Sequence, residues 1–158
     1  MARLFTPLLC AFCLLLVACS SGPVRRISEP TASIQQLSVA ADGSWSVDLR
    51  VQNYSSIAMR FDGIRLALTA GGEMAGTLQA TPQLSISQES ADIVTVTLTP
   101  TATARLLLAD TLAGGRSLPY ALEGELNAVP TDRGRARDYR IERSGVLSPV
   151  PGLPGVLR

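Results

Sequence analysis

The sequence predicts an all-β fold, an antiparallel sandwich of about seven strands with one short helix. Three observations support this prediction. Apolar and polar residues alternate along most of the chain, which is the period of a strand with one buried face. Glycine, proline, asparagine and serine separate the alternating segments. The segments are short and evenly spaced, which favours antiparallel over parallel pairing.

The clearest strand is WSVDLRVQN at residues 45–53, in which every second residue from Trp45 to Val51 is apolar. Residues 34–39 form its expected partner across a turn at residues 41–43. The next segment, MRFDGIRLALT, changes phase because its apolar residues fall in one register before Gly63 and in the other after it. A β-bulge at Gly63 would return both sets to one face.

The later elements follow from the same patterns. Alternation predicts strands, while leucines at helical spacing before Gly114 and Gly115 predict a helix that stops there. In chain order we expect strands at residues 74–80, 83–87 and 92–99, a helix at 101–113, and strands at 117–126 and 138–142.

The beginning of the chain has the pattern of an export signal. Residues 8–18 carry no charge, and such a run is too short for a membrane span of about 20 residues. Leu16-Val17-Ala18-Cys19 resembles the bacterial lipobox, in which the cysteine receives a diacylglyceryl group before cleavage makes it the new N-terminus. The alternative is an ordinary secretory signal in which Cys19 is accidental.

These features divide the chain into a lipoprotein signal peptide at 1–18, a lipidated Cys19 and tether at 19–32, a β-sandwich at 33–145 and a proline- and glycine-rich tail at 146–158. The other two cysteines lie in the signal peptide, so one mature chain forms no disulfide. Two or three acyl chains on Cys19 would anchor the protein stably. By resemblance to sorted lipoproteins, Ser20 favours the outer membrane, with the domain facing the periplasm.

The composition excludes several classes of function. All 14 basic residues are arginine, there is no histidine, and the chain from Cys19 onward carries 13 arginines against 13 acids. This balance argues against nucleic acid as a partner. Without histidine, and with Cys19 acylated, the common catalytic and zinc sites lack their central members, so we expect a non-enzymatic protein without cofactor or metal. Glu123 and Glu125 share a strand face and are the candidates for acid–base work; the simpler interpretation is a solvated strand exterior.

Residues 33–145 resemble a known family in the order of their elements and in three short motifs. The family has an Asn-Pro-Asn-like turn after a strand, a small-residue segment with glycine in a later strand, and a Tyr-x-x-x-Gly strand after a helix, which here is LPYALEGELN. This pattern is similar to the water stress and hypersensitive response domain of type 2 late embryogenesis abundant proteins. The matching positions are Asn53, Gly76, Tyr120 and Gly124.

That resemblance implies a fibronectin-type-III-like sandwich with a short helix, an association with desiccation and other stress, and no established catalytic site. The sequence departs from the family at the turn, where Tyr54 and Ser55 replace proline and asparagine. The asparagine that can satisfy local backbone groups is retained at position 53.

Two segments are candidate contact sites. In TDRGRARDYRIER, residues Arg133, Arg135 and Arg137 would grip phosphate or carboxylate groups of lipid headgroups or cell-wall polymer; the alternative is a charged turn that protects an edge strand. The tail SPVPGLPGVLR should run extended, because its three prolines fix φ and remove donors. It would either cover an apolar edge of the sandwich or dock onto another envelope protein.

The sequence thus predicts a lipoprotein held by membrane lipid through Cys19 and acting as a protective or binding module of the envelope under stress. A structural lipoprotein subunit of an envelope-spanning secretion or transport complex is the alternative, since it also needs a tethered sandwich. Either role would involve contact with an envelope protein or with lipid.

Overall fold

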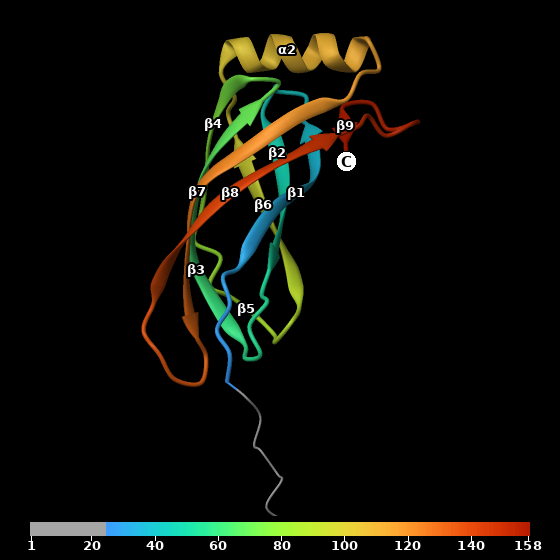
Figure 1. Cartoon of the computed structure of the whole chain (residues 1–158). Helices are drawn as coiled ribbons and strands as arrows, with labels where there is room; N and C mark the ends of the chain where they lie inside the picture. The colour runs from blue at the N-terminus through green and yellow to red at the C-terminus, as the bar shows by residue number, and fades with distance from the viewer. Residues whose placement is uncertain (1–24) are drawn as a thin grey trace, which may run out of the picture.

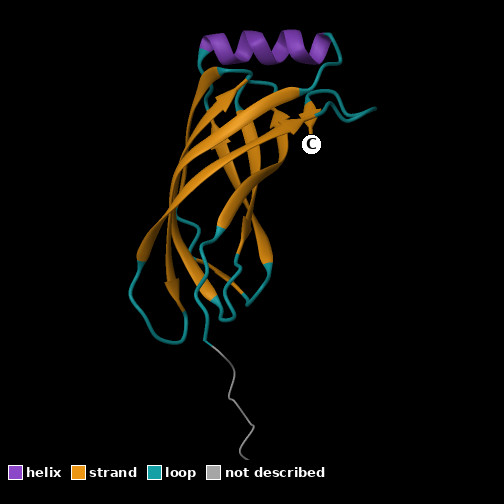
Figure 2. Ribbon diagram, viewed as in Figure 1, coloured by secondary structure: helices purple, strands orange, loops and turns teal. Residues whose placement is uncertain are grey.

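The computed structural model describes residues 25–158. These residues form two antiparallel sheets packed face to face, with a helix across one end (Figures 1 and 2). In chain order the elements are β1 (Thr31–Val39), β2 (Trp45–Gln52), β3 (Met59–Ala70), β4 (Glu73–Ala80), β5 (Leu84–Ile86), β6 (Ala91–Leu98), α2 (Ala102–Ala113), β7 (Leu118–Pro130), β8 (Arg137–Leu147) and β9 (Val156–Leu157).

One sheet has the strand order β6-β2-β1-β9, and the other has the order β4-β3-β7-β8 with β5 also paired to β3. The predicted all-β antiparallel sandwich is confirmed. Each predicted strand and the predicted helix lie within a few residues of their expected bounds. The described part of the chain has one strand beyond the prediction, the short β9.

The core lies between the sheets and consists of the inward set of each alternating strand. In β2 the apolar residues from Trp45 to Val51 are at most 1% exposed. Strand β2 is hydrogen-bonded to β1 on one side and to β6 on the other, so both of its edges are paired along its length. Full burial of each such side chain contributes about 1.5–3 kcal/mol to the stability of the fold. Strand β2 is therefore a major source of stability in its sheet.

The phase change in β3 is resolved by a bulge, as predicted. The β3–β7 register slips between Phe61 and Gly63. Met59 and Phe61 before the slip, and Ile64 after it, are all buried. The extra residue at the slip turns two apolar sets of opposite phase toward the same core.

Helix α2 closes the end of the sandwich opposite residue 25 (Figure 1). Thr101 caps its start, since the hydroxyl accepts a hydrogen bond from the Ala104 N–H at 3.2 Å. At its end Gly115 has φ +60°, and the N–H of Arg116 donates to the Thr111 carbonyl at 2.9 Å. This is a Schellman arrangement, which supports the predicted glycine stop. Ala104 and Leu108 are buried beneath the helix.

The C-terminal tail folds back instead of running extended. Positive φ angles at Gly152 and Gly155 produce turns, and β9 then pairs antiparallel with β1, with Leu157 opposite Leu37. The Val39 N–H donates to the Gly155 carbonyl at 2.9 Å. Leu157 is fully buried. The tail therefore covers part of the β1 edge as a short strand, a conformation that its prolines allow because β9 itself contains none.

No helix within residues 25–158 is both long and apolar enough to cross a membrane.

Candidate functional site

The chain enters the domain at the end opposite α2 (Figure 1), alongside the loop between β2 and β3. The Arg26 N–H donates to Ser56 Oγ at 2.8 Å, and the Ser56 N–H donates back to the Arg26 carbonyl at 3.0 Å. The Ser28 N–H donates to Ser55 Oγ at 3.0 Å. Residues 25–30 are thus bound to the domain. The expected boundary at residue 33 is too late, because these hydrogen bonds and the start of β1 at Thr31 add residues assigned to the tether.

Asn53 organises this end from within the protein. Its side chain is 1% exposed, and its Nδ2 donates to the carbonyls of Ile57 and Ser87, both at 2.9 Å, and of Ile86 at 3.2 Å. Its Oδ1 accepts from the Ser55 N–H at 2.9 Å. One amide side chain therefore joins the β2–β3 loop to the segment that follows β5, which is the backbone role the sequence suggested for it.

Ser55 explains how the turn forms without the asparagine of the family pattern. It is fully buried, and its Oγ donates to the Ser28 carbonyl at 3.3 Å while accepting from the Ser28 N–H. The residue that departs from the pattern thus has its own function here. It binds the incoming chain segment.

A depression of about 310 Å³ lies beside this entry segment, at the turn between β7 and β8. We call it the arginine pocket. The residues that line it are Arg25, Ile27, Pro130, Arg133, Gly134, Arg135, Arg137 and Tyr139. The structure therefore brings all three arginines predicted from the sequence into one site and adds a fourth from the entry segment.

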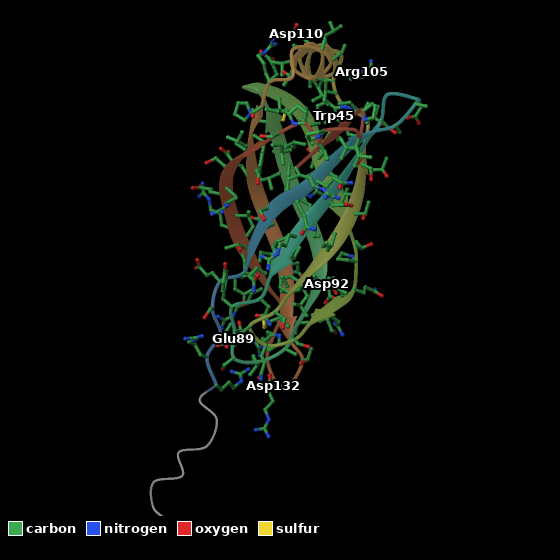
Figure 3. All side chains as sticks on the ribbon, turned by 90° about the vertical axis from the view of Figure 1, so that its right-hand side faces the viewer. Trp45, Glu89, Asp92, Arg105, Asp110 and Asp132 are labelled. Atoms are coloured by element: carbon green, nitrogen blue, oxygen red, sulfur yellow. The ribbon has the colours of Figure 1, made fainter. Side chains whose placement is uncertain are left out.

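Arg25 connects the entry segment to the β7–β8 turn. Its Nε lies 3.1 Å from Asp132 Oδ2, and its Nη2 donates to the Arg133 carbonyl. Asp132 is labelled in Figure 3 at this end of the molecule, far from Arg105 at the other end. Sequence reasoning missed Arg25 because it lies 107 residues before Asp132, within the segment assigned to the tether.

The charges in the pocket are unequal. The hydrogen bond from Arg25, together with that from the Arg133 N–H, lowers the pKa of Asp132, so this carboxylate stays ionised and offsets Arg25. Within residues 25–158, the guanidinium groups of Arg133, Arg135 and Arg137 form no ion pair. All three side chains are exposed. The pocket thus has a surplus of positive charge and free N–H donors.

Tyr139 contributes a second unusual group. It is 9% exposed and faces inward, as the alternation of β8 predicted. Its hydroxyl is the one buried side-chain polar atom of the described residues that has no hydrogen-bond partner. A buried polar group left unpaired costs about 1–3 kcal/mol. The hydroxyl remains able to donate to, or accept from, a group that enters the pocket.

The other family-pattern positions have steric roles. A Cβ at Gly124 would lie 2.1 Å from the Arg65 carbonyl oxygen on the neighbouring strand, and a Cβ at Gly76 would lie 2.7 Å from Leu98 Cδ1. Tyr120 is buried and packs its ring on Gly145. Cys19 lies outside the described residues.

Glu123 and Glu125 lie on the exposed outer face of the five-stranded sheet. Glu123 is opposite Glu142 on β8, and Glu125 is opposite Arg140. The two glutamates line an open surface depression together with Arg65 and Arg140, which places them on a solvated strand exterior of mixed charge. Within the described residues, no three His, Cys, Asp or Glu side chains are grouped as metal ligands.

A family model described as "Late embryogenesis abundant protein" matches residues 48–145. That range runs from β2 to β8 and contains Asn53, Gly76, Tyr120 and Gly124. No curated protein matches the chain.

Solved structures resemble the fold. The solution structure of a protein from Arabidopsis thaliana has a TM-score of 0.50 and 13% identity, and the match covers 83% of this chain and 85% of that one. The crystal structure of a protein from Archaeoglobus fulgidus has a TM-score of 0.44 and 10% identity, and the match covers 79% of this chain and 98% of that one. At 13% identity the likeness to the Arabidopsis thaliana protein is one of fold alone.

Proposed function

This chain belongs to the late embryogenesis abundant family, and from that premise we propose that it is a non-enzymatic lipoprotein of the cell envelope. Acyl chains on Cys19 anchor it in the outer membrane. The sandwich faces the periplasm and binds or shields envelope components under desiccation and related stress. The stress role rests on the family, and the anchoring rests on the lipobox-like residues 16–19.

The observation that carries the proposed orientation at the membrane is the attachment of the entry segment to the domain. Cys19 precedes Arg25 by six residues, and such a length of chain spans at most about 20 Å. Because Arg25 and Arg26 are bonded to Asp132 and Ser56, the domain begins at that point and has no further free linker. An acylated Cys19 would therefore hold the β2–β3 and β7–β8 loops next to the bilayer surface.

This protein would perform such a role as a folded domain, unlike the disordered hydrophilic proteins that share the family label. The chain is 46% hydrophobic and buries a continuous core between its sheets. Its outer faces carry hydroxyl, guanidinium and carboxylate groups, such as the exposed Thr95, Arg50 and Glu123. As water is lost, these groups replace water in hydrogen bonds to headgroups and wall polymers, while the apolar core keeps the domain folded.

A complementation experiment tests the proposal. A deletion strain should survive drying less well than its parent, and the wild-type protein should restore survival. Cys19→Ala should carry no acyl group, keep its uncleaved N-terminal segment, be missing from the outer-membrane fraction and fail to restore survival. Equal survival of deletion strain and parent would contradict the stress role, and recovery of Cys19→Ala in the outer-membrane fraction would contradict acyl anchoring.

The same strains test the alternative role. Recovery of the tagged wild-type protein in fixed stoichiometry with a large envelope complex would contradict a stand-alone protective module and favour a structural subunit. Recovery of the protein without such a complex would support the proposed function.

A further inference from the structure

We propose that the arginine pocket is a binding site for a phosphate group, held by the guanidinium groups of Arg133, Arg135 and Arg137 and by the hydroxyl of Tyr139. The ligand class is a phosphate monoester or diester, with the phospholipid headgroup and free phosphate as its two possible sources. The preference for the headgroup as the source rests on the proposed anchoring through Cys19. The assignment of the pocket as a phosphate site does not depend on that anchoring.

The lining of the pocket matches an anion with several oxygens. Four arginines line it and no carboxylate does. Two larger depressions among the described residues differ, since one contains Glu123 and the other Glu29, each together with arginine. Arginine N–H groups form short, charge-assisted hydrogen bonds to phosphate oxygens, and several guanidinium groups can share one phosphate. A volume of about 310 Å³ lies at the lower end of the range for small-molecule sites, about 300–1,000 Å³.

The unpaired hydroxyl of Tyr139 is an independent observation that points to a ligand. The residue is 9% exposed and lines the pocket, yet within residues 25–158 its hydroxyl bonds to nothing. Buried hydroxyls in native proteins are nearly always paired, and an unpaired one calls for an explanation. A phosphate oxygen beside the arginines would supply the missing acceptor. Arg133, Arg135 and Arg137, which line the same depression as Tyr139, are exposed and can supply the other hydrogen bonds to that phosphate.

The pocket is also held in shape before any ligand arrives. Arg25 bonds both to the Asp132 carboxylate and to the Arg133 carbonyl, so the β7–β8 turn is fastened to the entry segment. Gly134 at the centre of the turn has φ +153°, and a Cβ there would lie 2.8 Å from Pro130 Cγ. The turn therefore keeps a conformation in which the arginines on both sides of Gly134 line one depression. Such preorganisation reduces the entropy lost on binding.

The position of the pocket favours headgroups as the source of phosphate. The pocket includes Arg25, six residues after Cys19, at the end of the sandwich where the chain enters (Figures 1 and 3). An anchored domain would present this end to the bilayer surface. Phosphate binding would then fix the orientation of the sandwich and leave α2 and the outer faces of the sheets turned toward the periplasm.

The test uses the full chain with Cys19→Ser, so that no acyl chain contributes to binding. Inorganic phosphate is titrated while the arginine side-chain N–H signals are followed by NMR. We expect saturable shifts, at least tenfold weaker binding in Arg133→Gln/Arg135→Gln/Arg137→Gln, and roughly tenfold weaker binding in Tyr139→Phe. The control Arg105→Gln removes an exposed arginine on α2 at the far end and should bind like the parent.

Tyr139→Phe has a second readout that separates a binding role from a structural one. Because the hydroxyl has no partner in the protein, its removal should leave the melting temperature unchanged or raise it while weakening phosphate binding. A lowered melting temperature with unchanged phosphate affinity would overturn the role of Tyr139. Equal affinity for acetate and phosphate would overturn the choice of phosphate as ligand.

Vesicles distinguish the two sources. Sedimentation with phosphatidylglycerol vesicles should be reduced by the triple arginine variant and not by Arg105→Gln, and all these proteins share the same N-terminus. If the parent protein binds inorganic phosphate but does not sediment with the vesicles, free phosphate is the source. Absence of any difference between parent and triple variant with either probe would overturn the site. Because the protein tested is unacylated, this result is independent of the survival experiment.

Discussion

The hydroxyl of Tyr120 on β7 accepts a hydrogen bond from the backbone N–H of Ile34 on β1 at 3.2 Å, and this bond joins the two sheets of the sandwich. The Ile34 N–H is buried, and the β1–β2 register slips just after it, between Ile34 and Gln36. The tyrosine ring lies on Gly145, where a Cβ would come within 2.7 Å of Cε1. The tyrosine thus satisfies a buried donor at a β-bulge of the opposite sheet.

Tyr120→Phe should lower the free energy of unfolding by about 1–3 kcal/mol, because it keeps the ring on Gly145 but leaves the Ile34 N–H unpaired in the core. Urea denaturation followed by tryptophan fluorescence measures the change, since Trp45 is buried in β2. Tyr54→Phe is the matched control, because Tyr54 is 48% exposed, and it should leave the stability within about 0.5 kcal/mol of the parent. Equal stability of the two variants would contradict a role for the bond between the sheets.

Asn53→Ala should lower the free energy of unfolding by about 2–4 kcal/mol, since it leaves the carbonyls of Ile57, Ile86 and Ser87 without their amide donor in a buried site. The same denaturation experiment measures it. Asn127→Ala removes an amide that donates a hydrogen bond to the exposed Asp138, and should lower the free energy of unfolding by less than about 1 kcal/mol. A similar cost at both positions would show that Asn53 does not organise the entry end.

Gly124→Ala should destabilise the protein by more than about 3 kcal/mol, because its Cβ would lie 2.1 Å from the Arg65 carbonyl oxygen and φ is +152°. Gly72→Ala separates backbone strain from the steric clash, since φ is +89° there but no atom lies within 4 Å of the added Cβ. We expect Gly72→Ala to lower the free energy of unfolding by about 1 kcal/mol. Thermal unfolding of both variants measures the difference. If Gly124→Ala cost no more than Gly72→Ala, close approach of β3 and β7 at this point would be refuted.

The strands were predictable because their signal is local. Alternation in β2 and β8 reports which face is buried without reference to any distant residue, and the change of phase at Gly63 marks the bulge directly in the sequence. The glycine stop of α2 is equally local. These features need only the period of a strand, the geometry of a cap and the turn chemistry of glycine.

The features that were missed depend on contacts between distant segments. Strand β9 is two residues long, lies among prolines and forms because Leu157 meets Leu37 on the edge of β1. The entry segment is held mainly by hydrogen bonds, which leave no apolar period in residues 25–30. The sequence singled out the arginines on the β7–β8 turn, but the addition of Arg25 to their pocket depends on the folded path of the chain.

The ion pair between Arg25 and Asp132 should respond to acid. The hydrogen bond from Arg25 lowers the pKa of Asp132 below its ordinary value of 3.8, so the carboxylate is more acidic in the folded than in the unfolded protein. Its contribution to stability is therefore present above pH 3.8 and is lost as the pH falls through the lower, folded-state pKa. An NMR titration of the Asp132 carboxyl should give a higher pKa in Arg25→Gln than in the parent. An unchanged pKa would show that the pair does not persist in solution.

Removal of residues 148–158 should lower the melting temperature, because it exposes the edge of β1 and removes the buried Leu157 from the core. Leu157→Ala tests the same contact with the rest of the tail intact, and loss of one fully buried leucine costs about 2–5 kcal/mol. Leu153→Ala is its control, since Leu153 is 50% exposed in the same tail, and it should unfold like the parent. If the deletion left the melting temperature unchanged while proteins that co-purify with the full chain disappeared, the tail would be a docking peptide and its covering role would be wrong. A lowered melting temperature in both the deletion and Leu157→Ala would instead make β9 an integral edge strand of the sandwich.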